Sequence, residues 1–402
     1  MSANLPKNLP HIKVGLALSD AGFYHRETMR LPEDLSEFFQ RYQDKFETEE
    51  LFFELQPEMP WLKKKGDFSY VADEDNRWLK LGRAAEQGAS EVPYASIIEA
   101  MRRPGHIFGV HQSIRDMDIL SEDIHKKLET IESTQQGMLF AHLISADYFV
   151  FHLAQSKDYW DWNRSEQIAV ALKAFQGWAD FYKQSGFSFI PIIENLEFPK
   201  FPSTPEEMVS IFKTCREFLP NLKLCFDVSH FWRSRALILE NKARFEHLIP
   251  NFRILEASCT DYLDYAMEHI FTAGAGLSDG DIFLYHLGGC WKHLTHEIPG
   301  LRPGESPFLH KLRLDEPVYA YNPQVEMNLP KVINRLLRYN IERRQDVLIM
   351  LEIYQRNYIE MLEAARLIYD DIEQKARRIA ENSRRYAYLW EESAVGRENP
   401  KS

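Results

Sequence analysis

Residues 189–230 read FIPIIENLEFPKFPSTPEEMVSIFKTCREFLPNLKLCFDVSH, and this stretch shows how the chain is built. It begins and ends with continuously apolar runs, 189–195 and 222–228, which are typical of parallel strands buried on both faces. Between them, TPEE at 204–207 is a capping box with proline at the first helical position. Apolar residues then recur with the spacing of an amphipathic helix, at Met208, Ile211, Phe212 and Cys215. The stretch therefore predicts a strand–helix–strand unit.

Apolar runs of the same kind recur along the chain, with helical patterns between them. Six more strands are predicted, at 11–18 (HIKVGLAL), 51–55 (LFFEL), 107–112 (IFGVHQ), 148–153 (YFVFHL), 282–287 (IFLYHL) and 347–353 (VLIMLEI). One helical pattern starts at Ile168 and stops at Gly186, and another covers 329–340. Strands that alternate with helices fit a closed barrel or an open doubly wound sheet. No GxGxxG motif follows the first strand, so the dinucleotide-binding form of the open sheet lacks its signature.

We therefore predict an α/β fold with a single (β/α)8 TIM barrel, forming a metal-dependent catalytic domain over residues 1–356. Three segments exceed a minimal barrel. They are an insertion after the second strand (56–105), a long loop rich in proline and glycine after the seventh strand (297–330), and a C-terminal helical extension (357–402). The extension is predicted to pack on the barrel or to lie at the interface of a homo-oligomer.

The composition indicates a globular protein and argues against several partners. The chain has 402 residues, 45% of them hydrophobic, which is enough for a large core. A net charge of −12 repels a polyphosphate backbone and disfavours nucleic acid as a partner. No apolar run is long enough for a membrane span, the N-terminus lacks an apolar signal segment, and the four cysteines form no CxxC pair. These features predict a cytoplasmic protein with reduced thiols.

Six consecutive predicted strands end in a histidine or a carboxylate, namely His111, His152, Glu194, Asp227, His286 and Glu352. In a β/α barrel the C-terminal ends of all strands meet at one mouth, where active sites lie. Ionisable groups gathered there are costly to bury unless a cation compensates them. Carboxylates and neutral imidazoles are ordinary ligands of Mn, Mg, Co, Fe and Zn. We therefore predict a divalent metal site held by Glu194, Asp227, His286 and Glu352.

The two histidines of the earlier strands, His111 and His152, leave three interpretations open. They could bind a second metal, form hydrogen bonds with the substrate, or line the pocket. A further histidine, His230, lies three residues after Asp227 in the sequence DVSH.

These strand-end motifs carry a resemblance to a known family. They are IIEN (192–195), DVSH (227–230), YHL (285–287) and LEI (351–353). Over residues 11–356 their order and placement resemble the xylose-isomerase-like TIM-barrel superfamily. That superfamily holds sugar isomerases and epimerases alongside AP endonucleases of the endonuclease IV type. The set is more specific for the superfamily than for any one reaction.

Resemblance to the epimerase branch implies one divalent metal on the four predicted ligands. It also implies that Glu194 and Glu352 exchange a proton alpha to a carbonyl, through an enediolate, while the metal acts as a Lewis acid. The substrate would be a small sugar or a related polyhydroxy keto compound. Substrate contacts are predicted for His230, His111, His152, Lys292 and Trp232.

Resemblance to the AP-endonuclease branch implies three zinc ions instead. His111, His152 and Glu194 would hold the first, and the four ligands named above the second. The third would need His230 together with an Asp-x-His motif, but the chain has Leu294-Thr295-His296, so His230 and His296 are at most a remnant of that site. The missing aspartate and the acidic net charge favour small-molecule chemistry. An AP-endonuclease-like zinc phosphoesterase and a metal-dependent oxidase or lyase stay open as alternatives.

Overall fold

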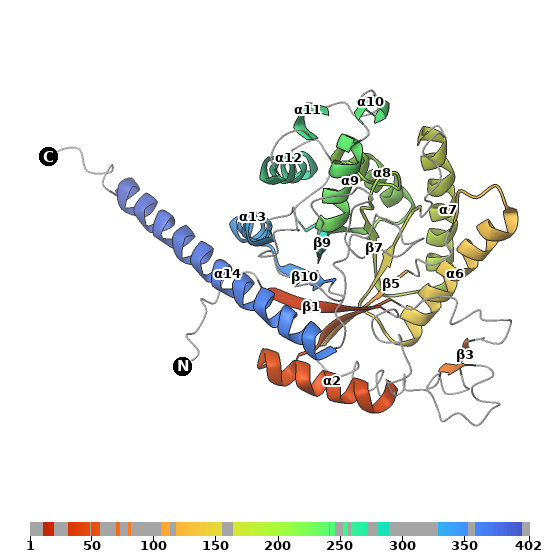
Figure 1. The fold of residues 1–402 in the computed structure, drawn as a ribbon, viewed down its shortest axis with the longest axis horizontal. Coiled ribbons are helices and arrows are strands. Elements are labelled where there is room, and N and C mark those ends of the chain that lie inside the picture. The colour runs from red at the N-terminus through yellow and green to blue at the C-terminus, as the bar shows by residue number, and fades with distance from the viewer. Residues whose placement is uncertain are drawn as a thin grey trace.

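Eight parallel strands close into a barrel (Figure 1). In chain order they are β1 (Ile12–Ser19), β2 (Phe52–Gln56), β5 (Ile107–His111), β6 (Tyr148–Phe151), β7 (Ile190–Glu194), β8 (Lys223–Asp227), β9 (Ile282–Leu287) and β10 (Val347–Leu351). Each strand pairs with the next, and β10 pairs with β1, so the predicted closed barrel is confirmed. This computed structural model describes residues 11–19, 31–48, 50–56, 70–72, 79–81, 106–112, 118–154, 164–240, 242–245, 252–255, 259–271, 280–288, 329–352 and 358–395.

The strands are buried on both faces, as their continuous apolar runs predicted. Alternate side chains, such as Tyr148 and Val150 of β6, fill the interior of the barrel. The residues between them face the surrounding helices. The ring of Phe151, for example, lies 5.5 Å from the ring of Phe175 on α7 (Arg164–Ser185), centroid to centroid. A strand with two apolar faces therefore has packing partners on each side.

The helices begin and end at the sequence signals that predicted them. Thr204 caps α8 (Pro205–Phe218), because its side chain accepts a hydrogen bond from the Glu207 backbone N–H at 3.3 Å. Gly186, directly after α7, has φ +66°, a left-handed conformation that glycine adopts without steric cost. The predicted helix before the last strand is α13 (Leu329–Glu342).

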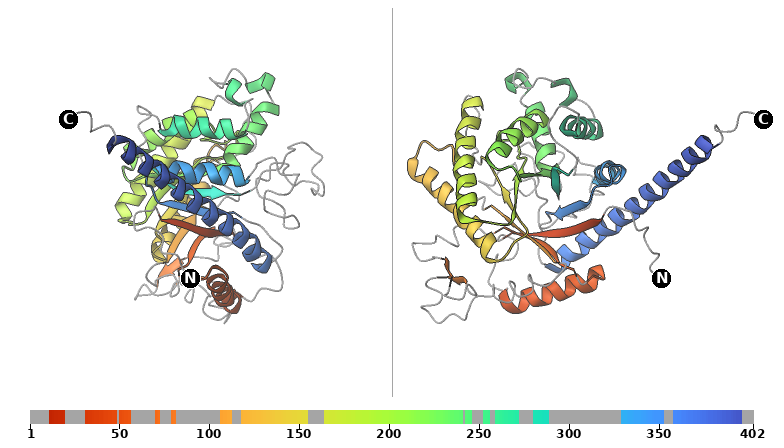
Figure 2. Two further views of the ribbon diagram at one scale, coloured as in Figure 1. Left: turned by 90° about the vertical axis from the view of Figure 1, so that its left-hand side faces the viewer. Right: turned by 180° about the vertical axis from the view of Figure 1, so that it is seen from behind.

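Between β8 and β9 the described residues form four helices that were not predicted from the sequence. They are α9 (Val228–Glu240), α10 (Lys242–Phe245), α11 (Phe252–Leu255) and α12 (Cys259–Phe271). Figures 1 and 2 show α10 to α12 grouped on one side of the barrel, where α12 packs against α8 and α13. The connection after β8 is therefore a fourth addition to the minimal barrel.

The insertion after β2 and the long loop after β9 fall largely outside the described residues. Of the insertion at 56–105, the structure describes a small antiparallel pair, β3 (Tyr70–Ala72) and β4 (Leu79–Leu81). Of the predicted loop 297–330, it describes only the first two residues of α13. The loop therefore stays a prediction.

The C-terminal extension is one long helix, α14 (Tyr358–Val395), which packs on α13 and on α2 (Leu31–Phe46). Its first half contributes buried side chains to the main core, among them Ile368 and Ile372. Its last turns extend beyond the body of the barrel (Figures 1 and 2). The first half of the helix therefore lies against α13 and α2, and the role predicted for the extension, including an oligomer interface, stays a prediction.

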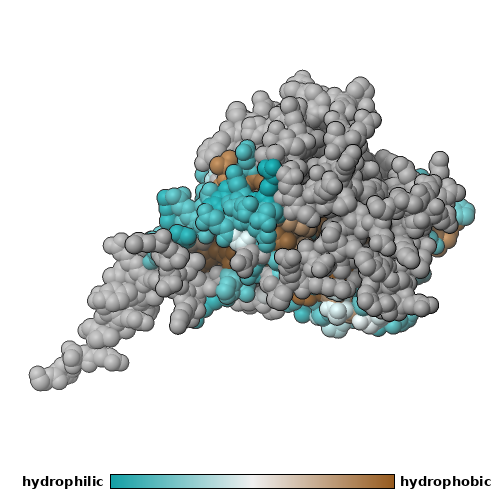
Figure 3. All heavy atoms as spheres, turned by 90° about the horizontal axis from the view of Figure 1, so that it is seen from below, coloured by the Kyte–Doolittle hydropathy of each residue, from teal (hydrophilic) through white to brown (hydrophobic). Residues whose placement is uncertain are grey.

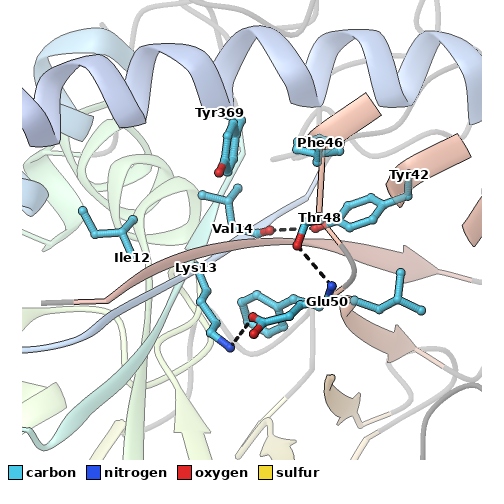
Figure 4. Close-up of a pocket in the computed structure, with 10 residues that line it drawn as sticks. Ile12, Lys13, Val14, Tyr42, Phe46, Thr48, Glu50 and Tyr369 are labelled. Atoms are coloured by element: carbon cyan, nitrogen blue, oxygen red, sulfur yellow. Dashed lines mark hydrogen bonds and ion pairs between the residues drawn. The ribbon is translucent and has the colours of Figure 1, made fainter. Parts of the chain in front are cut away.

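A cavity of about 110 Å³ lies between α2, α14 and the beginnings of β1 and β2 (Figure 4). The Tyr42 hydroxyl donates a hydrogen bond to the Val14 carbonyl at 3.0 Å, and the Lys13 ammonium pairs with Glu50 at 2.7 Å. Because the strands begin here, the cavity lies at the opposite end of the barrel from the mouth where active sites form. The candidate functional residues lie at the other end.

Figure 3 shows one face of the molecule, on which the described residues form a hydrophilic area with smaller apolar areas beside it. The large apolar side chains that the described residues expose are few, namely Ile124, Leu128, Val170 and Leu367. The described residues contain no helix with the length and apolarity that a membrane crossing requires.

Candidate functional site

All six predicted strand-end side chains lie together, buried at the C-terminal end of the barrel. His111, Glu194 and Asp227 are the last residues of β5, β7 and β8, and His286 is the last but one of β9. His152 and Glu352 directly follow β6 and β10. None of the six is more than 5% exposed. The register of the strands places these side chains at a similar height in the barrel. Asp227 on β8 pairs with His286 on β9, and β10, which directly precedes Glu352, pairs with β9 on its other side.

Glu194 is the centre of this group. Its Oε2 lies 2.9 Å from Nε2 of His111 and 2.7 Å from Nε2 of His152. Its Oε1 lies 3.1 Å from Nδ1 of His286. Burial would raise the pKa of Glu194, but the neighbouring histidines outweigh it and hold that pKa well below the usual range. Burial lowers the pKa of His152 to about 3 despite the charge of Glu194, so this imidazole is neutral, the form that binds metals.

Asp227, His286 and Glu352 form the other half of the group. Nδ1 of His286 lies 3.9 Å from Asp227 Oδ2 and 3.8 Å from Glu352 Oε1. Asp227 Oδ2 is buried and accepts no hydrogen bond from the described residues. Burial, followed by the negative charges of Glu352 and Glu194, raises the pKa of Asp227 to about 8 against the opposing effect of His230. The ionised form of Asp227 is therefore disfavoured unless a positive charge lies beside it.

The donor atoms fit a divalent cation. Several overlapping groups of the described residues have candidate ligand atoms that all lie within 4.8 Å of one another, among them Glu54/His111/His286. Two of these groups, His111/His152/Glu194 and Asp227/His286/Glu352, consist only of predicted strand-end residues. Buried carboxylates and imidazoles at such separations are the usual protein ligands of Mn, Fe, Co and Zn. Glu194 contacts His286 as well as His111 and His152, so it lies between these two groups. The arrangement could hold one or two ions.

His230 has hydrogen-bond acceptors at both ring nitrogens. Nδ1 lies 2.9 Å from the Asn195 carbonyl oxygen, and Nε2 lies 3.1 Å from Oε2 of Glu197. Burial would lower the pKa of His230, but Asp227 and Glu197 raise it to about 9. Its backbone N–H donates to Asp227 Oδ1 at 2.5 Å. His230 therefore acts as a donor from ring and backbone and helps to orient Asp227.

Three other predicted site residues have different outcomes. Lys292 and His296 lie outside the described residues, so their roles, and the remnant of a third site, stay predictions. Trp232 is described: it is 2% exposed, belongs to the main apolar core, and the Arg235 guanidinium lies 4.6 Å from its ring centroid. Contact between Trp232 and a substrate stays a prediction as well.

Two carboxylates of the site, Glu54 and Glu197, were not predicted from the sequence. Glu54 of β2 is 1% exposed, and its Oε2 lies 3.1 Å from Nε2 of His286. Glu197, in the segment after β7, contacts His230 as described above. Glu54 lies two residues before the end of β2, whereas the site residues were predicted from the ends of the strands. The signal that could have found it is a single glutamate inside the apolar run LFFEL.

Backbone hydrogen bonds from polar side chains hold the site residues in place. Asn195 accepts from the Asp227 backbone N–H at 2.7 Å and donates to the Asp227 carbonyl oxygen at 2.9 Å. Gln112 accepts from the His152 backbone N–H at 2.7 Å and donates to the Thr134 hydroxyl at 2.7 Å. The loops that carry the candidate ligands are thus fixed before any ligand binds.

Comparison with known proteins supports the fold. No family model and no curated protein matches the chain. Among solved structures, a D-tagatose 3-epimerase-like protein matches 91% of this chain and 99% of its own, with 14% identity and a TM-score of 0.52. A candidate xylose isomerase from Rhodospirillum rubrum matches 90% and 99%, with 13% identity and a TM-score of 0.54. An L-ribulose 3-epimerase matches 96% and 100%, with 13% identity and a TM-score of 0.50.

These matches extend over most of both chains, and they reproduce the closed barrel rather than a shared fragment of it. The chain therefore has the closed (β/α)8 barrel fold that these solved structures share.

Proposed function

We propose that this protein is a divalent-metal-dependent isomerase or epimerase that acts on a small sugar or a related polyhydroxy keto compound. One observation carries the proposal: two buried glutamates, Glu194 and Glu352, reach the same nitrogen of His286, at 3.1 and 3.8 Å, beside the buried carboxylate of Asp227. The epimerases and the candidate isomerase with this fold make a sugar-type substrate the natural first choice.

The chemistry needs two positioned carboxyl groups. Moving a proton alpha to a carbonyl requires one group to remove it and another to return it, and side chains positioned for this contribute roughly 10²–10⁴ in rate. Glu194 and Glu352 would take these roles, since they approach Nδ1 of His286 from different strands, Glu194 at the end of β7 and Glu352 directly after β10. A divalent cation held by Glu194, Asp227, His286 and Glu352 would stabilise the negative charge that develops on the substrate oxygen.

His230 would orient the substrate. Its Nδ1–H is committed to the carbonyl of Asn195, whereas its Nε2–H faces the side chain of Glu197. A hydroxyl or carbonyl oxygen of the substrate can share or take over that second donor. A role in orientation predicts a smaller loss of rate for His230→Ala than for replacement of a group that transfers the proton.

A zinc phosphoesterase is the second candidate, and a separate observation favours it. His111, His152 and Glu194 form their own candidate metal group beside the first. Two metal ions so close together suit the displacement of a phosphate ester. The −12 net charge disfavours a nucleic-acid substrate for such a reaction.

The decisive experiment is hydrogen exchange from solvent, combined with elemental analysis of the purified protein. We expect one Mn, Mg or Co per chain. In deuterated water we expect deuterium at the carbon alpha to the carbonyl for at least one member of a panel of ketoses and inososes. Glu352→Gln should lower this exchange by about 10²-fold or more, and His230→Ala by less.

Other results would replace the proposal. Two or three zinc ions, with cleavage of an abasic-site oligonucleotide and no exchange, would establish the phosphoesterase. Oxygen consumption by an iron-loaded protein, again without exchange, would establish an oxidase.

A further inference from the structure

Among the described residues, Glu54 is the carboxylate that contacts His286 at Nε2, on the opposite side of the ring from the other carboxylates. It lies on β2, whereas the predicted ligands come from β5 to β10 and the residues directly after those strands. Its Oε2 is 3.1 Å from Nε2 of His286, while Nδ1 of the same ring faces Glu194 at 3.1 Å and Glu352 at 3.8 Å. The imidazole is therefore held between one carboxylate at Nε2 and a group of carboxylates at Nδ1.

This arrangement favours one ring nitrogen of His286 for metal binding. A carboxylate can only accept a hydrogen bond, and carboxylate oxygens lie 3.1 Å from both ring nitrogens, so without a metal each nitrogen carries a hydrogen. Glu194, Asp227 and Glu352 all face Nδ1, where a divalent cation would replace the hydrogen, and Nε2 would then keep its hydrogen and donate it to Glu54. Histidines that bind metals usually donate their second ring N–H to a carboxylate or carbonyl, which fixes the ring and increases its basicity.

The barrel interior is built to keep Glu54 in this position. Gly109 on β5 pairs with Glu54 on one side and with Tyr148 of β6 on the other. A Cβ atom on Gly109 would lie 2.0 Å from Cζ of Tyr148, so the missing side chain is what admits the tyrosine ring beside the carboxylate. Burial, and then the charge of Glu54, raise the pKa of Tyr148 well above its ordinary value, so the hydroxyl remains a neutral donor close to Glu54.

We propose that Glu54 is a positioning residue: by accepting the Nε2–H of His286 it directs Nδ1 toward the metal site and strengthens metal binding. The proposal rests on the metal site proposed above and extends it by a residue that binds no metal itself. A purely structural role, in which Glu54 only balances a buried imidazolium, would leave metal affinity unchanged once the protein is folded.

The test measures metal affinity rather than activity. Kd for Mn²⁺ and the visible absorption of the Co²⁺ form are compared between wild type, Glu54→Gln and Glu54→Asp. Removing such a partner typically weakens metal binding by about 10–100-fold. We expect a loss of that size in Glu54→Gln, a partial recovery in Glu54→Asp, and an altered Co²⁺ spectrum in Glu54→Gln.

The matched control is Glu50→Gln, which changes an exposed glutamate just before the same strand, paired with Lys13 at the other end of the barrel. It should leave Kd unchanged. If Glu54→Gln binds Mn²⁺ with the wild-type Kd, the proposal is wrong.

A second measurement is independent of how the variants fold. In ¹⁵N-histidine spectra of the Zn²⁺-loaded wild type, His286 should show a protonated Nε2 and a metal-bound Nδ1; the opposite assignment would overturn the proposal. The results also separate the two proposals. Loss of affinity in Glu54→Gln without any isotope exchange in the wild type would reject the isomerase but support the role of Glu54. A wild type that binds no divalent cation would reject both.

Discussion

Asp227 is the residue in which the need for a cation is most evident. Its Oδ2 is buried without a hydrogen bond from the described residues, while Asn195 and the His230 backbone fix the rest of the residue. Because burial and the charges of Glu352 and Glu194 raise the pKa of Asp227 to about 8, its ionised form is disfavoured at neutral pH until a cation compensates it. Burying such a group costs several kcal/mol unless a charge compensates it. The protein is therefore less stable without metal, and metal binding should increase its free energy of unfolding.

The corresponding prediction concerns Asp227→Asn. We expect the wild type to gain stability on addition of Mn²⁺ or Zn²⁺, by about 2.7 kcal/mol at a free concentration of 100 times Kd. An amide is a weaker, uncharged ligand, so Asp227→Asn should lose most of this gain and most of its bound metal. Thermal denaturation with and without metal measures the gain in stability, and elemental analysis measures the amount of bound metal. Full occupancy and an unchanged metal-dependent shift in the variant would contradict the ligand assignment.

Among the elements, α7 and α8 determine how the segment after β7 leaves the site. Arg164 at the start of α7 pairs with Glu207 of α8, and it also donates to the carbonyls of Pro199 and Lys200 at 2.7 and 3.1 Å. Its guanidinium lies 4.6 Å from the Phe198 ring centroid. This one side chain therefore ties two helices to the segment that carries Glu197 toward His230.

We expect Glu207→Gln to destabilise the protein by about 2 kcal/mol, between the values for exposed and fully buried ion pairs. Burial would raise the pKa of Glu207, but Arg164 and the hydrogen bonds from Ser203 lower it below its ordinary value. A lowered pKa contributes stability above the unfolded-state pKa, and this contribution is lost as pH falls through the folded value.

The difference in unfolding free energy between wild type and Glu207→Gln should therefore be complete at neutral pH and shrink below about pH 4. Urea denaturation across this range measures it. The control is Glu217→Gln, on the exposed face of the same helix, which should have little effect at any pH. Equal stability of wild type and Glu207→Gln at pH 7 would show that the pair contributes nothing.

For the molecule as a whole, the barrel interior is a packed core that continues directly into the site. Tyr148, Val150, Ile192 and Cys225 lie in one apolar cluster, one layer below the histidines and carboxylates. Gly109 provides the space that the tyrosine ring occupies. The floor of the site is therefore as tightly packed as the rest of the core, and small changes in volume there should be costly.

Two glycine substitutions test this packing. Gly109→Ala places a methyl group 2.0 Å from Tyr148 Cζ and should cost about 1–3 kcal/mol or more in unfolding free energy. Gly177→Ala, within α7, meets no atom within 4 Å and should instead stabilise by about 0.5–1 kcal/mol, because alanine favours the helix. Urea denaturation of both variants measures the contrast. A Gly109→Ala protein as stable as wild type would show that the interior adapts more easily than the structure implies.

Much of the architecture and the members of the main site followed from the order of residues. Eight apolar runs alternate with helical patterns, and parallel strands bring their C-terminal ends to one mouth. The neighbours Glu194, Asp227, His286 and Glu352 could therefore be placed together without any knowledge of contacts. The capping box at α8 and the helix stop at Gly186 followed in the same way, because local backbone chemistry determines them.

The remaining features depend on contacts between residues far apart in the chain, which no local pattern encodes. Glu54 and His286 are neighbours only because β2 and β9 lie across the same barrel, and Glu197 meets His230 only because the segment after β7 folds over α9. The helices α9 to α12 lie where a minimal barrel has a single connection, so the β/α repeat did not predict them. Which nitrogen of His286 faces which carboxylate depends on side-chain orientation, and only the closed barrel determines that orientation.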